Sequence, residues 1–105
     1  MPNVISKTDG FLAWIDGLKD QKGRARVLTR IVAAEAGNFG DCGPIGDGVS
    51  EMRIHYGPGY RVYFAQEGIN VYLLIAGGDK SSQKQDIKQA KALWNDLKKA
   101  GAVCK

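Results

Sequence analysis

Residues 49–64 read VSEMRIHYGPGYRVYF, and this stretch decides the fold. Apolar and polar side chains alternate on both sides of the turn Gly57-Pro58-Gly59, as they do in two half-buried antiparallel strands. The stretch therefore predicts a β-hairpin with one face toward a core and one polar face. The side chains expected on the polar face are Glu51, Arg53, His55, Arg61 and Tyr63.

The alternation also constrains the register of this hairpin. We expect Tyr56 to pair with Tyr60 across the turn, which places His55 beside Arg61 on the polar face. A slip of one residue would bury Arg61 in the core, so the faces of both strands are well specified.

A third strand is predicted at Val71–Ala76, after a turn at Glu67-Gly68. This register places Tyr72 beside Tyr63 on the polar face. The same segment is the longest unbroken apolar run of the chain, and it is far shorter than the roughly 20 residues that a membrane-spanning helix needs. We therefore expect no membrane segment.

Two amphipathic helices are predicted ahead of the hairpin. Apolar residues recur three and four positions apart up to Leu18, after an N-cap at Thr8 or Asp9. A second helix follows an N-cap at Asp20 and ends at Gly37. Because the two are joined by only a few residues, we expect them to pack as an antiparallel helical hairpin.

A last helix is predicted to begin at Ser81 or Ser82, with an apolar stripe and lysines on its outer side. With a short strand at Met1–Ile5, the order becomes β-α-α-β-β-β-α. This pattern predicts a single α+β domain over residues 1–105, in which an antiparallel sheet packs against a helical hairpin.

Composition and charge agree with a globular protein. Hydrophobic residues make up 44% and charged residues 25% of the chain, and the formal net charge is +4. Residues 1–48 are neutral, so the basic excess belongs to residues 49–105, where it is compatible with a polyanionic partner. Cys42 and Cys104 have no metal-site spacing and are too few for a disulfide scaffold. No secretory leader is visible, and we expect a cytoplasmic protein without metal or cofactor.

The polar sheet face is where chemistry is expected. Its arginines could bind phosphate, and its tyrosines could stack on bases. His55, the one histidine, is the candidate general base, since Arg53 and Arg61 as neighbours would keep its ring neutral. Glu51 is the alternative base. The simplest competing interpretation is a solvated sheet face without a site.

Three segments, residues 38–41, 48–64 and 77–83, resemble the RelE/ParE superfamily of toxins, and most closely its HigB-like branch of addiction-module killer proteins. The block SEMRIHYGPGYRVY carries most of this resemblance, which covers roughly residues 10–97. It implies the toxin of a type II toxin–antitoxin system. The implied activity is that of an mRNA endoribonuclease, or mRNA interferase, which cuts on the ribosome without metal and so inhibits translation.

The resemblance also assigns residues. Tyr60-Arg61 falls on the arginine of the family that contacts phosphate, and Arg53 and His55 fall near a basic pair on the preceding strand. Lys80 falls near a basic residue that follows the last strand. The implied catalytic set is His55, Arg61, Arg53, Lys80 and Glu51, with RNA binding by Tyr63, Tyr72 and Lys84.

The chain departs from the family at one position. RelE has a catalytic tyrosine at or near the start of its last helix, and residues 83–87 contain none, so Tyr63 or Lys80 is left as the acid. Two alternatives stay open: a ParE-like poison of DNA gyrase, and a non-catalytic remnant that binds only its antitoxin. The partners implied are a helix-turn-helix antitoxin, as a possible heterotetramer, and mRNA on the ribosome.

Overall fold

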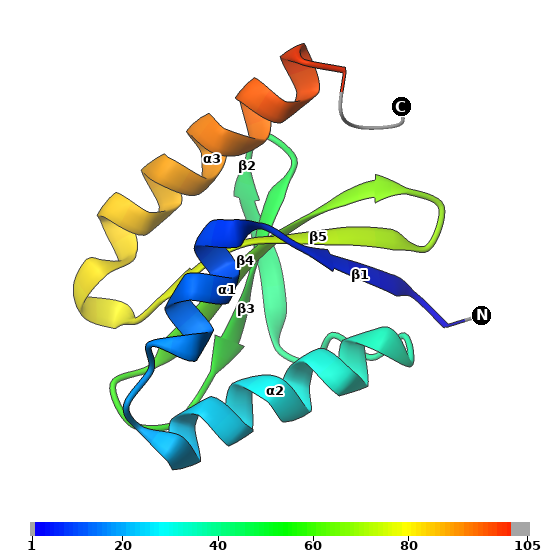
Figure 1. The fold of residues 1–105 in the computed structure, drawn as a ribbon. Coiled ribbons are helices and arrows are strands. Elements are labelled where there is room, and N and C mark those ends of the chain that lie inside the picture. Colours follow the sequence, from blue (N-terminus) through cyan, green and yellow to red (C-terminus); the bar gives the residue numbers. More distant parts are fainter. Residues whose placement is uncertain (1, 102–105) are drawn as a thin grey trace.

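The computed structural model describes residues 2–101 and shows a single α+β domain built on one sheet (Figure 1). The elements in chain order are β1 (Val4–Lys7), α1 (Asp9–Asp16), α2 (Gln21–Glu35), β2 (Cys42–Gly46), β3 (Val49–Ile54), β4 (Tyr60–Gly68), β5 (Val71–Gly78), the short 3₁₀ turn η1 (Lys80–Ser82) and α3 (Gln83–Lys99). No helix among the described residues is long and apolar enough to cross a membrane.

The sheet has five strands in the order β1-β5-β4-β3-β2. The predicted order omitted β2, whose Cys42–Gly46 sequence contains a proline and two glycines that a strand usually lacks. Pro44 is tolerated because β2 lies at the edge of the sheet. The sheet is also not wholly antiparallel as predicted, since β1 pairs in parallel with β5. Met1, the first residue of the predicted strand, lies outside the described residues.

The β3–β4 hairpin differs from the predicted register by two residues. Ile54, not Tyr56, pairs with Tyr60, and Arg53 lies opposite Arg61. The strands end earlier because residues 55–59 form the connection, in which Gly57 and Gly59 have positive φ. A shift of two positions leaves every side chain on its predicted face, because the side-chain period of a strand is also two.

The β4–β5 hairpin changes faces. The turn lies at Ile69-Asn70 instead of Glu67-Gly68, and the register shifts between Gln66 and Gly68 and again between Tyr63 and Phe64. Tyr63 therefore pairs with Ala76, and Tyr72 lies on the opposite face of the sheet from Tyr63. The predicted pairing of Tyr63 with Tyr72 is wrong.

Both faces of the sheet are covered by helices (Figure 1). On one face, α1 packs on β5 and α2 packs on β3 and β4, instead of against each other as the predicted hairpin. This core contains Phe11, Val27, Met52, Val62 and Leu74, all completely buried. On the other face, α3 covers β4 and β5. The second core contains Val49, Tyr63, Ile75, Ala90 and Trp94.

Local hydrogen bonds fix the ends of the helices. The Thr8 side chain accepts a hydrogen bond from the backbone N–H of Phe11, and that of Asp20 accepts one from Gly23, so both predicted N-caps are confirmed. Asp79 caps η1 and leads the chain into α3. Ser82 occupies the N-cap position of α3 without a side-chain capping bond.

Candidate functional site

A buried carboxylate lies at the centre of the predicted polar face. Glu51 on β3 is 6% exposed, and its Oε2 accepts a hydrogen bond of 3.0 Å from Arg53 Nε. Its Oε1 accepts another of 3.0 Å from Gln83 Nε2, on the first residue of α3. Such bonds compensate the desolvation of the buried charge. They also join the hairpin to the start of α3.

The bonds continue outward through Asp41, which precedes β2. Arg53 Nη1 donates to Asp41 Oδ1 at 2.9 Å, and His55 Nε2 contacts Asp41 Oδ2 at 2.5 Å. The bond to His55 and, secondly, the bond to Arg53 lower the pKa of the Asp41 carboxyl. Bonds to Asp41 and Glu51 raise the pKa of Arg53. His55 therefore lies against a carboxylate that it shares with Arg53, and it does not lie beside Arg61 as the predicted register placed it.

Arg61 is the buried cation of the cluster. It is 6% exposed and lies opposite Arg53 on the neighbouring strand. Its Nε lies 3.8 Å from Glu51 Oε1, and neither Nε nor Nη1 has a hydrogen-bond partner within the described residues. A buried donor without a partner costs about 1–3 kcal/mol, and more when it is charged. An anionic ligand that accepted these bonds would remove this cost.

Tyr63 lies under α3 and is completely buried. Its hydroxyl has no hydrogen-bond partner within residues 2–101. Burial, followed by the nearby carboxylates of Asp86 and Glu51, raises the pKa of Tyr63 to about 12. The phenol is therefore protonated at neutral pH and is a possible proton donor.

The two predicted lysines lie where the sheet meets α3. Lys80 and Lys84 are exposed, at the start of η1 and in the first turn of α3. The Lys80 side chain crosses Gly59, where a Cβ would meet it at 3.3 Å. Asp86 lies over Gly78, the residue of β5 that pairs with Arg61. The start of α3 thus brings charges of both signs to the rim of the cluster.

Of the predicted site residues, Glu51, Arg53 and Tyr63 lie around Arg61, and His55 is connected to Arg53 through Asp41. Tyr72 does not belong with them, because it packs in the other core, with its ring centroid 4.8 Å from that of Phe39. The competing interpretation of a solvated face is wrong for Glu51, Arg61 and Tyr63, which are buried on the side that α3 covers.

Sequence reasoning missed three residues of the site: Asp41, Gln83 and Asp86. Asp41 was hidden in a glycine-rich segment, although its backbone carbonyl accepts a hydrogen bond from the Arg53 N–H. Arg30 of α2 holds the same segment in place. It donates to the carbonyls of Phe39, Asp41 and Arg53, the first and second at 2.9 and 3.2 Å. No periodic pattern marks these positions in the sequence.

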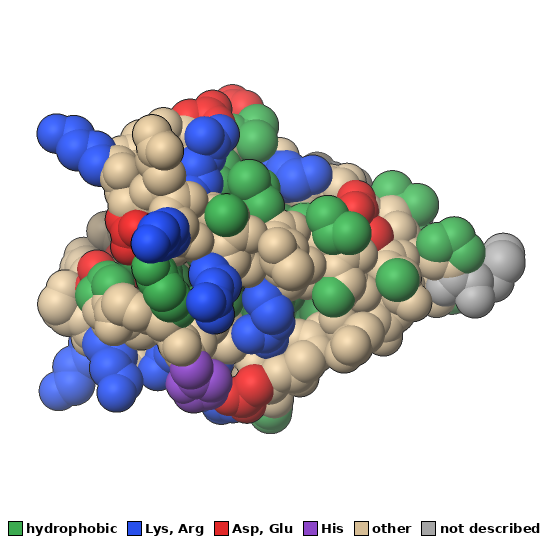
Figure 2. Space-filling model, turned by 90° about the horizontal axis from the view of Figure 1, so that it is seen from below, with side chains coloured by type: hydrophobic (Ala, Val, Ile, Leu, Met, Phe, Trp, Pro, Cys, Tyr) green, Lys and Arg blue, Asp and Glu red, His purple; other side chains and the backbone are tan. Residues whose placement is uncertain are grey.

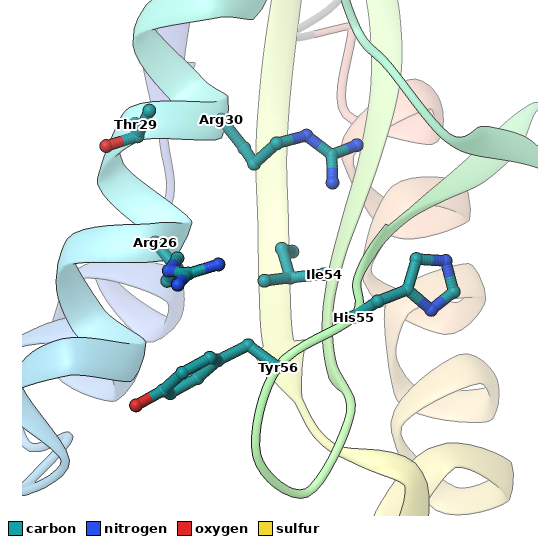
Figure 3. Close-up of a pocket in the computed structure, with 6 residues that line it drawn as sticks. All are labelled: Arg26, Thr29, Arg30, Ile54, His55 and Tyr56. Carbon is teal, nitrogen blue, oxygen red and sulfur yellow. The ribbon is translucent and has the colours of Figure 1, made fainter.

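A hollow lies beside the cluster, between α2 and the end of β3 (Figure 3). Its lining residues are Arg26, Thr29, Arg30, Ile54, His55 and Tyr56. Lys and Arg side chains also gather on this face of the molecule, close to its one histidine (Figure 2). As for metals, no group of three or more His, Cys, Asp or Glu side chains in residues 2–101 is placed to hold an ion.

The fold and the cluster define a class: a small α+β domain with a charged, largely buried cluster between its sheet and last helix. A protein of Haemophilus influenzae described as an uncharacterized protein is 43% identical over 93 residues, which are 89% of this chain and 94% of that protein. The chain belongs to the same family as this protein. No protein-family model and no solved structure matches the chain.

Proposed function

We propose that the protein is the toxin of a type II toxin–antitoxin system and acts as a ribosome-dependent mRNA endoribonuclease. The observation that carries this proposal is Arg61, a nearly buried guanidinium beside a carboxylate, with two nitrogens that have no hydrogen-bond partner within residues 2–101. The sequence resemblance places the phosphate-binding arginine of RelE-like toxins at this same residue.

In this proposal Arg61 binds the scissile phosphate, which reaches the buried Nε and Nη1 atoms only when the groups that cover them move aside. The ribose 2′-oxygen attacks the adjacent phosphorus, the bond from phosphorus to the 5′-oxygen breaks, and a 2′,3′-cyclic phosphate remains. Negative charge builds on the phosphate oxygens in the transition state, where preorganised donors contribute most. Arg61 supplies such donors, and Arg53 on the neighbouring strand and Lys80 at the rim add positive charge.

The reaction also needs a base for the 2′-hydroxyl proton and an acid for the leaving 5′-oxygen. We assign the base to His55, because it is exposed while both oxygens of Glu51 are engaged by Arg53 and Gln83. Lys80 and Tyr63 are the two candidates for the acid. Lys80 is exposed at the rim, whereas Tyr63 reaches substrate only if the first turn of α3 moves away.

The test is expression without antitoxin, followed by primer-extension mapping of transcripts. Wild type should arrest growth and leave discrete cuts in mRNA, and Arg61→Gln and His55→Ala should relieve both effects while the proteins remain folded. Arg24→Gln is the matched control, because this exposed arginine of α2 pairs with Asp16 away from the cluster. Cleavage by Tyr63→Phe at the wild-type rate would assign the acid to Lys80.

A second candidate is a binding toxin that cleaves no RNA, such as a gyrase poison or a remnant that binds only its antitoxin. The observation in its favour is that Glu51 and Arg53 satisfy each other and Asp41, as a structural network would. A gyrase poison predicts a DNA-damage response with intact mRNA, and a remnant predicts no growth arrest. For either activity, we propose a cytoplasmic protein neutralised by a helix-turn-helix antitoxin in a heterotetramer.

A further inference from the structure

The hollow between α2 and the end of β3 lies outside the Glu51–Arg61 cluster and has its own composition. It has a volume of about 530 Å³, which falls in the range of small-ligand sites. Ile54 forms an apolar part of its wall, and a second hollow that contains Lys22 adjoins it along α2. The two share Arg26, Thr29 and Tyr56, so they form one groove, which we call the α2 groove.

The charge of the α2 groove has one sign. Among the described residues, its lining includes the cations Lys22, Arg26 and Arg30 together with His55, and no acidic residue. Arg30 is held by backbone carbonyls, so its charge is fixed in position without a neutralising carboxylate. Arg26 is exposed and has no ion-pair partner within residues 2–101. The groove is therefore suited to an anion.

An aromatic ring narrows the class of anion. The Arg26 guanidinium lies over the Tyr56 ring, with its central carbon 4.7 Å from the ring centroid, and both residues line the groove (Figure 3). Thr29 adds a hydroxyl that can donate or accept. Proteins that bind single-stranded nucleic acid combine these groups, because phosphate contacts give affinity and base stacking on aromatic side chains adds to it. An acidic peptide would use the cations but not the ring.

We propose that the α2 groove binds a nucleotide of single-stranded RNA next to the segment held at Arg61, with Arg26 moving from the Tyr56 ring onto its phosphate and Tyr56 stacking against its base. The proposal rests on the proposed RNA-cleaving function, whose site it extends. His55 connects the two places, because it lines the groove and also contacts Asp41, which bonds Arg53. A strand that leaves the cluster past His55 enters the groove.

The experiment measures RNA binding apart from cleavage. The full chain is titrated by fluorescence anisotropy against a labelled, fully 2′-O-methylated RNA of about eight nucleotides, a length within the usual range of single-strand sites. Without a 2′-hydroxyl this probe cannot be cut. Stacking of one base is worth about 1–3 kcal/mol, so Tyr56→Leu should weaken binding by about 5- to 150-fold. Arg26→Gln should weaken it at least about threefold and flatten its salt dependence.

Two matched variants serve as controls. Tyr56→Phe keeps the ring, and Arg24→Gln removes the same charge from α2 outside the groove; both should bind within about twofold of wild type. The proposal is overturned if Arg24→Gln weakens binding as much as Arg26→Gln, or if folded Tyr56→Leu binds like wild type. If thermal unfolding shows Tyr56→Leu to be unfolded, the comparison of Arg26→Gln with Arg24→Gln decides.

Competition separates RNA from other polyanions, and activity separates this proposal from the proposed function. Poly-glutamate or phosphatidylglycerol vesicles that displace the RNA at equal charge concentration, in an Arg26-dependent way, overturn the RNA assignment. If Tyr56→Leu and Arg26→Gln both bind and cleave RNA like wild type, the proposed role of the groove is overturned, whereas the proposed nuclease activity is not. If RNA binding depends on the groove residues but the protein cuts no mRNA in cells, the proposed RNA site in the groove is supported and the proposed nuclease activity is overturned.

Discussion

Replacing Tyr63 by Phe should stabilise the protein. The Tyr63 hydroxyl is completely buried and has no hydrogen-bond partner within the described residues, so folding removes it from water without compensation. Such a group costs about 1–3 kcal/mol. The variant loses the dispersion contacts of one oxygen atom, which are worth a few tenths of a kcal/mol. The net gain in the free energy of unfolding should be about 1 kcal/mol.

Urea unfolding of wild type and Tyr63→Phe at neutral pH measures this difference. For a domain of about this size, 1 kcal/mol corresponds to a rise of roughly 4–8 °C in Tm. A loss of more than about 0.5 kcal/mol in Tyr63→Phe would refute the reasoning, because it would mean that the hydroxyl makes a stabilising bond.

The pH dependence gives a second check on the same group. Burial raises the pKa of Tyr63 from 10.0 to about 12, so the folded protein retains a proton that the unfolded chain loses above pH 10. The free energy of unfolding of wild type is therefore unaffected by this ionisation below pH 10 and falls as the pH rises toward 12. The advantage of Tyr63→Phe over wild type should therefore grow between these pH values. A constant difference would place the hydroxyl in contact with water.

Two further substitutions test the packing and the outer part of the cluster. Gly77→Ala would place a Cβ 2.1 Å from the Trp14 ring and should lower the free energy of unfolding, measured in urea, by about 1–3 kcal/mol. In Gly10→Ala of α1 the new Cβ meets only Thr8 Oγ1, at 3.8 Å, and this variant should be more stable than wild type by about 0.5–1 kcal/mol. Equal effects of the two substitutions would contradict the packing. The bonds from His55 and Arg53 lower the pKa of Asp41 below 3.8, so its contribution to stability is present above that pH and is lost as the pH falls through the folded value. Asp41→Asn should accordingly lose stability near neutral pH and show a shallower decline in acid than wild type, and an unchanged acid profile would argue against the Asp41 bonds.

The alternation in residues 49–64 was sufficient to predict the hairpin and the face of each side chain. It could not distinguish registers two residues apart, because both keep the same faces, and so Arg53 was not placed opposite Arg61. Tyr72 lies on the other face than predicted because the register shifts between Gln66 and Gly68, and this shift has no sequence signal. β2 also lacks a clear sequence signal, because its proline and two glycines are unusual in a strand. The carboxylate of Asp41, which precedes β2, was therefore not predicted at the site.

The sequence does contain a signal that a helix covers the predicted polar face. The unbroken apolar run at Val71–Ala76 is typical of a strand buried on both faces. Leu74 enters one core while Leu73 and Ile75 enter the other. Trp94 lies on the apolar stripe of the last helix, and this stripe is buried only if the sheet has a second apolar face for it to pack on. Read together, these residues indicate a layer on each side of the sheet, and with it the burial of Arg61 and Glu51.

Primer extension on transcripts from cells that briefly express wild type, Arg61→Gln or Arg24→Gln shows whether Arg61 binds the phosphate at which mRNA is cut. We expect discrete cuts with wild type and Arg24→Gln, and intact transcripts with an Arg61→Gln protein that still unfolds cooperatively in urea. Cuts of equal frequency with Arg61→Gln, or intact mRNA in cells arrested by wild type, would contradict this role of Arg61.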